Sequence, residues 1–276
     1  MEITQYSPPT ARPLVMGVLN MTPDSYYDGG RHNQQDAAAV RVQQMIGEGA
    51  SIIDVGGEST GPGSVEVAEE EELKRILPII PILQYSNTPI SIDTTKASVA
   101  RRAIEAGAMI INDVSAGRHD PAMFPLVAEK GCKIVLMYSK DDSPRTTVRD
   151  LQYEDVMATV KAFLTDRIRE AEARGIRREQ IVVDPGLGHF VSSDPKYSWE
   201  ILDRLEELAD LGCPILVSPS RKSFTADHPG DPPEQRLPGT LRATEIAIQN
   251  GASIIRTHDV KETMKMINIQ FPICIE

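Results

Sequence analysis

The stretch Gly49-Ala-Ser-Ile-Ile53 recurs in nearly the same form as Gly107-Ala-Met-Ile-Ile111 and Gly251-Ala-Ser-Ile-Ile255. A polar residue follows each copy, Asp54 after the first and Asn112 after the second. Glycine commonly ends a helix, and a short apolar run after it is typical of a buried strand. The repeat therefore predicts a helix end, then a buried strand, then a polar side chain at the carboxyl end of that strand.

Eight strand patterns alternate with eight helical patterns along the chain. The predicted strands are rich in Ile and Val, as parallel strands buried on both faces should be. They are Leu14–Asn20, Ser51–Gly57, Pro89–Thr94, Met109–Ser115, Lys133–Tyr138, Ile181–Gly186, Pro214–Ser220 and Ser253–His258. The predicted helices are Asp36–Glu48, Val65–Leu83, Lys96–Ala106, Asp120–Lys130, Tyr153–Arg174, Lys196–Leu211, Pro233–Asn250 and Lys261–Ile269. We expect Asp36, Asp120 and Asp194 to cap helices.

Strict alternation over 276 residues predicts an α/β fold, a single (β/α)₈ TIM barrel. We expect one domain over residues 1–276, with residues 1–13 as an N-terminal extension. Alternation alone does not establish closure, so a doubly wound open sheet is the alternative. In a closed barrel the carboxyl ends of the strands form the active-site face. The long connections at Met21–Gln35, Glu58–Ser64 and Ser139–Gln152 would lie over that face and are typical of functional loops.

Composition narrows the class of protein. A formal charge of −11 and a pI of about 5.0 make a nucleic-acid-binding surface unlikely. Three unclustered cysteines, Cys132, Cys213 and Cys274, favour a reducing compartment over a disulfide framework or a zinc site. The chain has no signal-peptide pattern and no apolar run near the roughly 20 residues that span a bilayer. We therefore expect a cytoplasmic protein without a membrane partner.

Ligand-type side chains end most of the predicted strands. Asp93, Asn112 and Asp184 follow buried apolar runs, where an unpaired carboxylate is costly and needs a donor. A flat heterocycle edged with N–H groups, a metal ion or an arginine would each supply one.

Basic residues end the last two predicted strands. Lys222, Arg256 and His258 bring donors and positive charge, enough for a phosphate or pyrophosphate. Asn20 adds an oxygen of the kind that Mg²⁺ prefers. Together these residues indicate a site for a polar heterocycle with a phosphorylated tail.

Each of these residues also has a structural interpretation. A single Asp at a strand end often caps the following helix, and Asp54 and Asp113 are candidates for that role. Met137 is typical of wall packing. The glycine-rich runs match neither a P-loop nor a G-x-G-x-x-G fingerprint. Convergence at seven of eight strand ends favours the functional interpretation.

Seven motifs, taken together and in order, resemble the dihydropteroate synthase family over about residues 14–269. The matching stretches are Met16–Gly30, Gly49–Thr60, Ile90–Thr94, Ile110–Val114, Asp184–Gly188, Ser220–Phe224 and Arg256–Val260. The resemblance implies a transferase of folate biosynthesis that joins 4-aminobenzoate to 7,8-dihydropterin-6-methyl diphosphate with Mg²⁺, giving dihydropteroate and pyrophosphate. It also implies a homodimer.

The resemblance assigns roles to particular residues. The catalytic residues are Asp93, Asp184, Lys222, Arg256 and His258. The pterin ring is implied to bind Asp93, Asn112, Met137, Asp184, Gly188 and Lys222. The diphosphate is implied to bind Asn20, Thr60, Arg256 and His258, with Asn20 as the Mg²⁺ ligand and the loop around Asp24 assisting. The 4-aminobenzoate is implied to bind Thr60, Pro62, His189, Phe190, Arg221 and Ser223.

Two positions depart from the family pattern near the aminobenzoate. Gly61 stands where the family usually has arginine, and His189 stands where it usually has phenylalanine. The segment Gly188–Lys196 is closer to the divergent, sulfonamide-insensitive branch. We therefore expect reduced sulfonamide sensitivity.

Two other classes of protein fit part of the pattern. A methyl-tetrahydrofolate-binding methyltransferase domain shares the Asp and Asn pocket but needs no diphosphate site, so the Ser220–Ser223 and Arg256–His258 motifs argue against it. A pterin-binding homologue without synthase activity would need neither the Mg²⁺ ligand nor the full set of strand-end residues.

Overall fold

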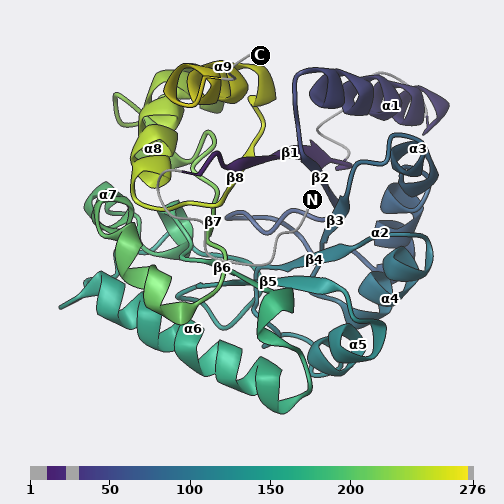
Figure 1. Ribbon diagram of the computed structural model, residues 1–276, viewed down its shortest axis with the longest axis horizontal. Helices are drawn as coiled ribbons and strands as arrows, with labels where there is room; N and C mark the ends of the chain where they lie inside the picture. Colours follow the sequence, from purple (N-terminus) through teal and green to yellow (C-terminus); the bar gives the residue numbers. More distant parts are fainter. Residues whose placement is uncertain (1–10, 23–30, 273–276) are drawn as a thin grey trace.

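The computed structural model describes residues 11–22 and 31–272, and its eight strands form one parallel sheet in a ring (Figure 1). The strands are β1 (Leu14–Asn20), β2 (Ile52–Gly56), β3 (Ile90–Asp93), β4 (Ile110–Asp113), β5 (Lys133–Met137), β6 (Ile181–Asp184), β7 (Leu216–Val217) and β8 (Ile254–Thr257). Strand β1 pairs with both β2 and β8, and a parallel bridge joins Val183 to Ile215. A ring of this kind confirms the barrel prediction and excludes the open sheet.

Helices surround the strands, as Figure 1 shows. They are α1 (Arg31–Gly47), α2 (Glu69–Ile76), α3 (Ile80–Gln84), α4 (Ala97–Glu105), α5 (Met123–Lys130), α6 (Val156–Ala173), α7 (Pro195–Asp203), α8 (Leu237–Gln249) and α9 (Val260–Gln270). Short 3₁₀ turns lie at Arg178–Gln180, Gly188–Phe190, Leu205–Leu211, Ser223–Thr225 and Pro233–Gln235. In the part of the chain that the structure describes, no helix is long and apolar enough to cross a membrane.

Several predicted helix boundaries were wrong. Asp36 does not cap α1, because that helix already begins at Arg31. The predicted helix Val65–Leu83 is two short helices, because Pro78, which lies between them, lacks the N–H that a continuous helix needs. Asp194 does cap α7, since its side chain accepts a hydrogen bond from the Lys196 N–H.

Asp120 caps differently from the prediction. Helix α5 begins at Met123, and Ala122 occupies its N-cap position. The Asp120 carboxylate instead accepts the Ala122 N–H at 2.9 Å and, with its other oxygen, the N–H of Ala97 in the first turn of α4 at 2.8 Å. One carboxylate thus satisfies backbone donors from two helices.

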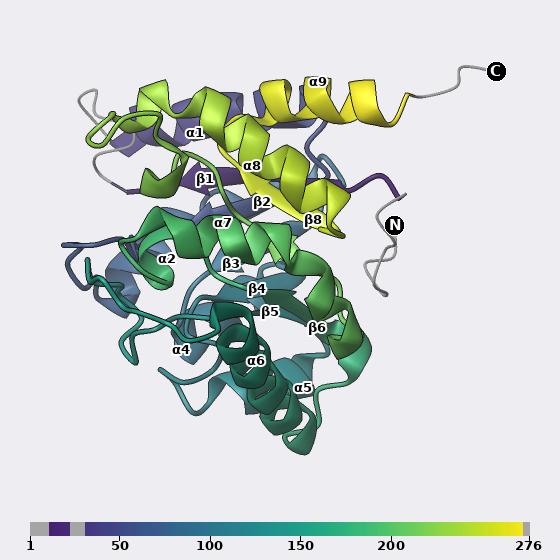
Figure 2. The ribbon, with the colours of Figure 1, turned by 90° about the vertical axis from the view of Figure 1, so that its left-hand side faces the viewer.

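The connections after β2 and β5 lie on the same side of the barrel, as Figure 2 shows. The backbone N–H of Thr146, in the β5 connection, donates to the carbonyl of Thr60, in the β2 connection, at 3.1 Å. The predicted loop Met21–Gln35 is shorter than expected, because α1 includes its last five residues. Its segment 23–30, with Asp24, lies outside the described residues.

Candidate active site

The barrel interior has an apolar layer with a polar layer above it. The apolar layer is a buried cluster of Met16, Ile52, Ile110, Val135, Val182, Leu216 and Ile254. Two positions later in the chain come Asp54, Asn112, Met137, Asp184, Ser218 and Arg256. Side chains two apart on a strand point to the same face, so this second set lies inside the barrel, nearer its carboxyl end. The spacing places six strand ends around one site.

Arg256 is the centre of the polar layer. Its Nε donates to Oδ2 of the fully buried Asp54 at 2.6 Å, and its Nη2 donates to Oδ2 of Asp93 at 2.8 Å. Nδ2 of Asn112 donates to the same Asp54 oxygen at 3.1 Å. Residues from four strands, β2, β3, β4 and β8, therefore form one network.

Burial and charge shift the acidity of this network. Burial raises the pKa of Asp93 to about 7, although Arg256 opposes the rise. Burial lowers the pKa of Arg256, but the carboxylates of Asp54 and Asp93 outweigh burial and raise it, so the guanidinium stays charged. The sequence makes Asp54 a candidate helix cap, but the structure places it in the floor of the site.

Asp184 and Lys222 form the other half of the site. Asp184 accepts the Gly186 N–H at 2.7 Å, and burial raises its pKa while Lys222 lowers it. Burial lowers the pKa of Lys222 to about 8, and the charge of Asp184 limits that fall. Gly188, at φ +64°, lies against the aliphatic part of Lys222, where an added Cβ would be 3.4 Å from Cδ. The charge of Asp184 favours the ionised form of Lys222, and the charge of Lys222 favours the ionised form of Asp184.

His258 lies beside the first strand. Its Nε2 is 3.4 Å from Nδ2 of Asn20, and its Nδ1 is 3.0 Å from Oγ of Ser220. Burial and the nearby Arg256 charge lower the pKa of His258 to about 4. At neutral pH the ring is therefore neutral in the site as described, and the positive charge that we predicted for His258 stays a prediction.

A cleft of about 300 Å³ adjoins this polar layer. It is lined by Gly61, Pro62, Thr146, Leu187, His189, Phe190, Lys222, Ser223 and Arg236. Four of the residues assigned to aminobenzoate, Pro62, His189, Phe190 and Ser223, are among them. Oγ of Ser223 lies 3.3 Å from Nε2 of His189, and Nζ of Lys222 lies 5.1 Å from the centroid of the Phe190 ring. Lys222 thus belongs to both the polar layer and the cleft.

Two of the residues assigned to aminobenzoate are not among the residues that line the cleft. Arg221 does not line the cleft, because its guanidinium makes a two-point ion pair with Asp259, at 2.6 and 3.0 Å. Thr60 does not line it either, although its carbonyl contacts the cleft residue Thr146. Met137 is buried at the end of β5. This position suits packing in the barrel wall and also contact with a bound pterin ring.

The sequence interpretation missed Thr146, Leu187 and Arg236. Thr146 lies in the long connection Ser139–Gln152. The sequence predicts a functional role for that connection but for no particular residue in it. Arg236 precedes α8 and has no motif around it. Its Nη1 donates to the carbonyl of Arg221 at 2.9 Å. Only the fold brings it to the cleft.

The fold and the site together define a class of protein. It is a barrel whose carboxyl face carries carboxylates, an amide and cations beside a cleft. Residues 16–258 match the family described as pterin binding enzyme, and the chain belongs to that family. It is 40% identical to the dihydropteroate synthase of Bacillus subtilis, over 92% of this chain and 86% of that protein.

Two further comparisons agree. The dihydropteroate synthase of Xanthomonas albilineans with 4-aminobenzoic acid superposes with a TM-score of 0.87 at 38% identity, covering 96% of this chain and 94% of the other. A probable bifunctional folylpolyglutamate synthase/dihydropteroate synthase of Haloferax volcanii is 43% identical over 92% of this chain. The chain spans only 30% of that relative's length.

Proposed function

We propose that this chain is a dihydropteroate synthase of folate biosynthesis, which transfers the dihydropterin-6-methyl group from diphosphate to the amino group of 4-aminobenzoate. One observation carries the proposal. Lys222 interacts with the buried Asp184 of the polar layer and also lines the apolar cleft, so a pterin and an arylamine would meet at one side chain.

The polar layer suits a pterin ring. Asp93, Asn112 and Asp184 offer acceptors to the ring N–H groups, and the protonated Lys222 offers a donor to its carbonyl. Burial raises the pKa of Asp93 and Asp184, because their charged forms lack solvation. A ligand that donates hydrogen bonds to these carboxylates would supply that missing stabilisation. The cleft, with Phe190 and Leu187 in its wall, suits the flat apolar ring of the second substrate.

The diphosphate would lie beside Arg256 and His258. Arg256 uses Nε and Nη2 for carboxylates, and within the described residues its Nη1 makes no hydrogen bond, so it is available to an anion. Neutral His258 adds a donor without a charge that would need a partner. These groups would stabilise the negative charge that develops on the leaving diphosphate.

The residues present fit a Mg²⁺ ion that arrives with the diphosphate. Among residues 11–22 and 31–272, no group of three His, Cys, Asp or Glu side chains can hold a metal ion. Mg²⁺ usually keeps several waters and binds through one or two protein oxygens plus substrate phosphates, so the single oxygen of Asn20 suffices. When bound, the ion would supply further charge stabilisation for the leaving group.

The chemistry needs no enzyme nucleophile. The bond between the methylene carbon and the diphosphate oxygen breaks, and its electron pair leaves with the diphosphate. The lone pair of the arylamine then forms the carbon–nitrogen bond, and the amine passes its proton to the departed diphosphate, which is a base. Asp93 and Asp184 would stabilise the pterin-conjugated cation more than the ground state. The connections after β2 and β5 would keep water from that cation.

Pyrophosphate release tests the proposal. We expect release from the dihydropterin diphosphate that requires both Mg²⁺ and 4-aminobenzoate, and that is lost in Asp184→Asn and Lys222→Met. Lys161→Met, at a surface pair with Asp210, is the matched control and should keep wild-type rates. Tight pterin binding without turnover in the wild-type protein would instead assign the chain to the binders without synthase activity.

Two finer expectations accompany this function. The free, buried thiols of Cys132 and Cys213 support a reducing compartment, the cytoplasm. The homodimer implied by the resemblance stays a prediction, and sedimentation velocity at several protein concentrations would test it.

A further inference from the structure

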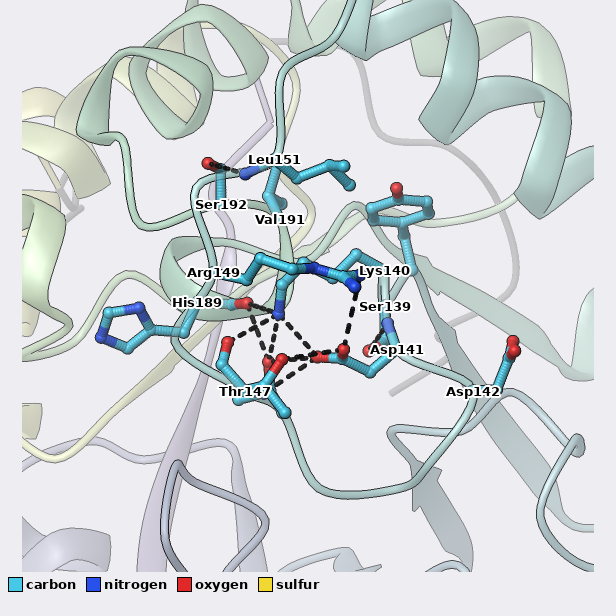
Figure 3. Close-up of polar contacts among 12 residues, drawn as sticks. Ser139, Lys140, Asp141, Asp142, Thr147, Arg149, Leu151, His189, Val191 and Ser192 are labelled. Carbon is cyan, nitrogen blue, oxygen red and sulfur yellow. Dashed lines mark hydrogen bonds and ion pairs between the residues drawn. The ribbon is translucent and has the colours of Figure 1, made fainter.

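A polar cluster around the buried side chain of Lys140 joins the connection after β5 to the wall of the cleft (Figure 3). We call Lys140, Asp141, Thr146 and Thr147 the loop latch. The side chain of Lys140 is fully buried, and its Nζ lies within hydrogen-bonding distance of three latch oxygens: Oδ2 of Asp141 at 2.6 Å, the Thr147 carbonyl at 2.7 Å and Oγ1 of Thr146 at 3.1 Å. A fourth oxygen, outside the latch, shares the three N–H groups of the ammonium.

That fourth acceptor belongs to the cleft wall. Nζ of Lys140 donates to the His189 carbonyl at 2.6 Å, and Oγ1 of Thr146 donates to the same oxygen at 2.8 Å. The backbone N–H of Lys140 donates to the Phe190 carbonyl at 2.9 Å. The latch therefore holds the backbone of the two consecutive residues whose side chains line the cleft.

Asp141 keeps the latch charged. Burial raises the pKa of Asp141, but hydrogen bonds from Lys140 and Thr147 outweigh burial and hold it at about 2. Oδ1 and Oδ2 each accept a hydrogen bond from Thr147, from its hydroxyl and its N–H, at 2.9 Å. A buried ion pair is weak evidence for stability, because desolvation offsets most of its attraction. We therefore assign the Lys140–Asp141 pair to fixing the geometry of this loop rather than to stabilising the fold.

We propose that the loop latch positions His189 and Phe190 against the arylamine and so sets the affinity of the enzyme for its second substrate. This inference rests on the proposed function. Lys140 and Asp141 are positioning residues, because neither lines the cleft.

The latch should act mainly on the arylamine. It contacts the cleft wall and, through the Thr146 N–H, the Thr60 carbonyl in the connection after β2. The groups offered to the pterin, Asp93, Asn112 and Asp184, lie on strands and make no hydrogen bond to the latch. Loosening the latch therefore moves the arylamine wall and leaves these three strand-end groups in place, and it reaches the pterin only through the Phe190 ring beside Lys222.

Steady-state kinetics with each substrate varied in turn tests the proposal. Lys140→Met removes the ammonium that holds the His189 carbonyl while keeping the length of the side chain. Of the contacts that this substitution removes, the charged hydrogen bond to the His189 carbonyl holds the cleft wall, and its loss predicts a rise of about tenfold in the KM for 4-aminobenzoate. The KM for the pterin substrate and kcat should stay within about twofold. Lys161→Met, which breaks a surface pair, should change neither KM.

Asp141→Asn keeps the shape of the side chain and should shift the same KM in the same direction but less. It decides the matter if Lys140→Met does not fold. Equal changes in both KM values, or no change in either, would overturn the latch proposal. Absence of turnover in the wild-type protein would instead refute the proposed function, so the two failures are distinguishable.

Discussion

Replacing Arg256 by methionine should destabilise the barrel by much more than one hydrogen bond. The substitution removes the 2.6 Å contact to Asp54 and the 2.8 Å contact to Asp93. Asp54 is fully buried, so its carboxylate would be left without a cation. Removing one partner of a buried ion pair costs about 3–5 kcal/mol. Asp93, whose pKa is already about 7, can take up a proton at neutral pH, so we expect a loss near 3 kcal/mol, the lower end of that range.

A second substitution separates stability from activity. Asp54→Leu, added to Arg256→Met, removes the stranded carboxylate and should restore about 2 kcal/mol. Asn112 then loses its 3.1 Å acceptor, which accounts for the remaining loss of about 1 kcal/mol. Both variants should lack synthase activity, because both lack the proposed diphosphate ligand.

Urea denaturation at pH 7, followed by the fluorescence of the single tryptophan, Trp199, measures these differences. Arg101→Met, which breaks a surface pair with Glu129, is the matched control and should leave the midpoint unchanged. The reasoning fails if Arg256→Met is as stable as the control, or if the double variant is less stable than the single one.

Two further predictions concern pH and inhibition. Because the pKa of Lys222 is about 8, kcat/KM should fall as pH rises through 8, where the ammonium loses the proton it offers to the pterin; a flat profile there would contradict this role. The same pKa is lowered from 10.5 on folding, so between about 8 and 10.5 the unfolded chain binds more protons, and this group's contribution to the free energy of unfolding rises with pH. Gly61 and His189 both line the cleft, so we expect weak sulfonamide inhibition, and Gly61→Arg with His189→Phe should lower the inhibition constant; an unchanged constant in the double variant would remove the basis for this expectation.

Local sequence patterns predicted the barrel and its polar face. The Gly-Ala-x-Ile-Ile repeat marked β2, β4 and β8, and with the other apolar runs it placed most strands of the ring within one to two residues, because glycine ends a helix and apolar runs form buried strands. Strand β7 was the exception, with two residues observed where seven were predicted; Pro214 and Pro219, which flank it, lack the N–H that strand pairing uses. Asp93, Asn112, Asp184 and Arg256 were predicted at strand ends and lie there.

Tertiary structure decided which of these side chains meet. Asp54 and Arg256 are 202 positions apart in the chain, and only closure of the ring brings β2 and β8 to either side of β1. Arg221 shares a motif with Lys222, but its own φ of 56° and the position of Asp259 direct it out of the cleft.

The same holds for the cleft wall. Thr146, Arg236 and the loop latch come from connections with no periodic pattern, so their sequence carries no signal for where they fold. The alternation of side chains along a strand is a local property, and the chain alone determines it. Contacts between loops depend on distances across the barrel mouth, which exist only after all eight strands have closed.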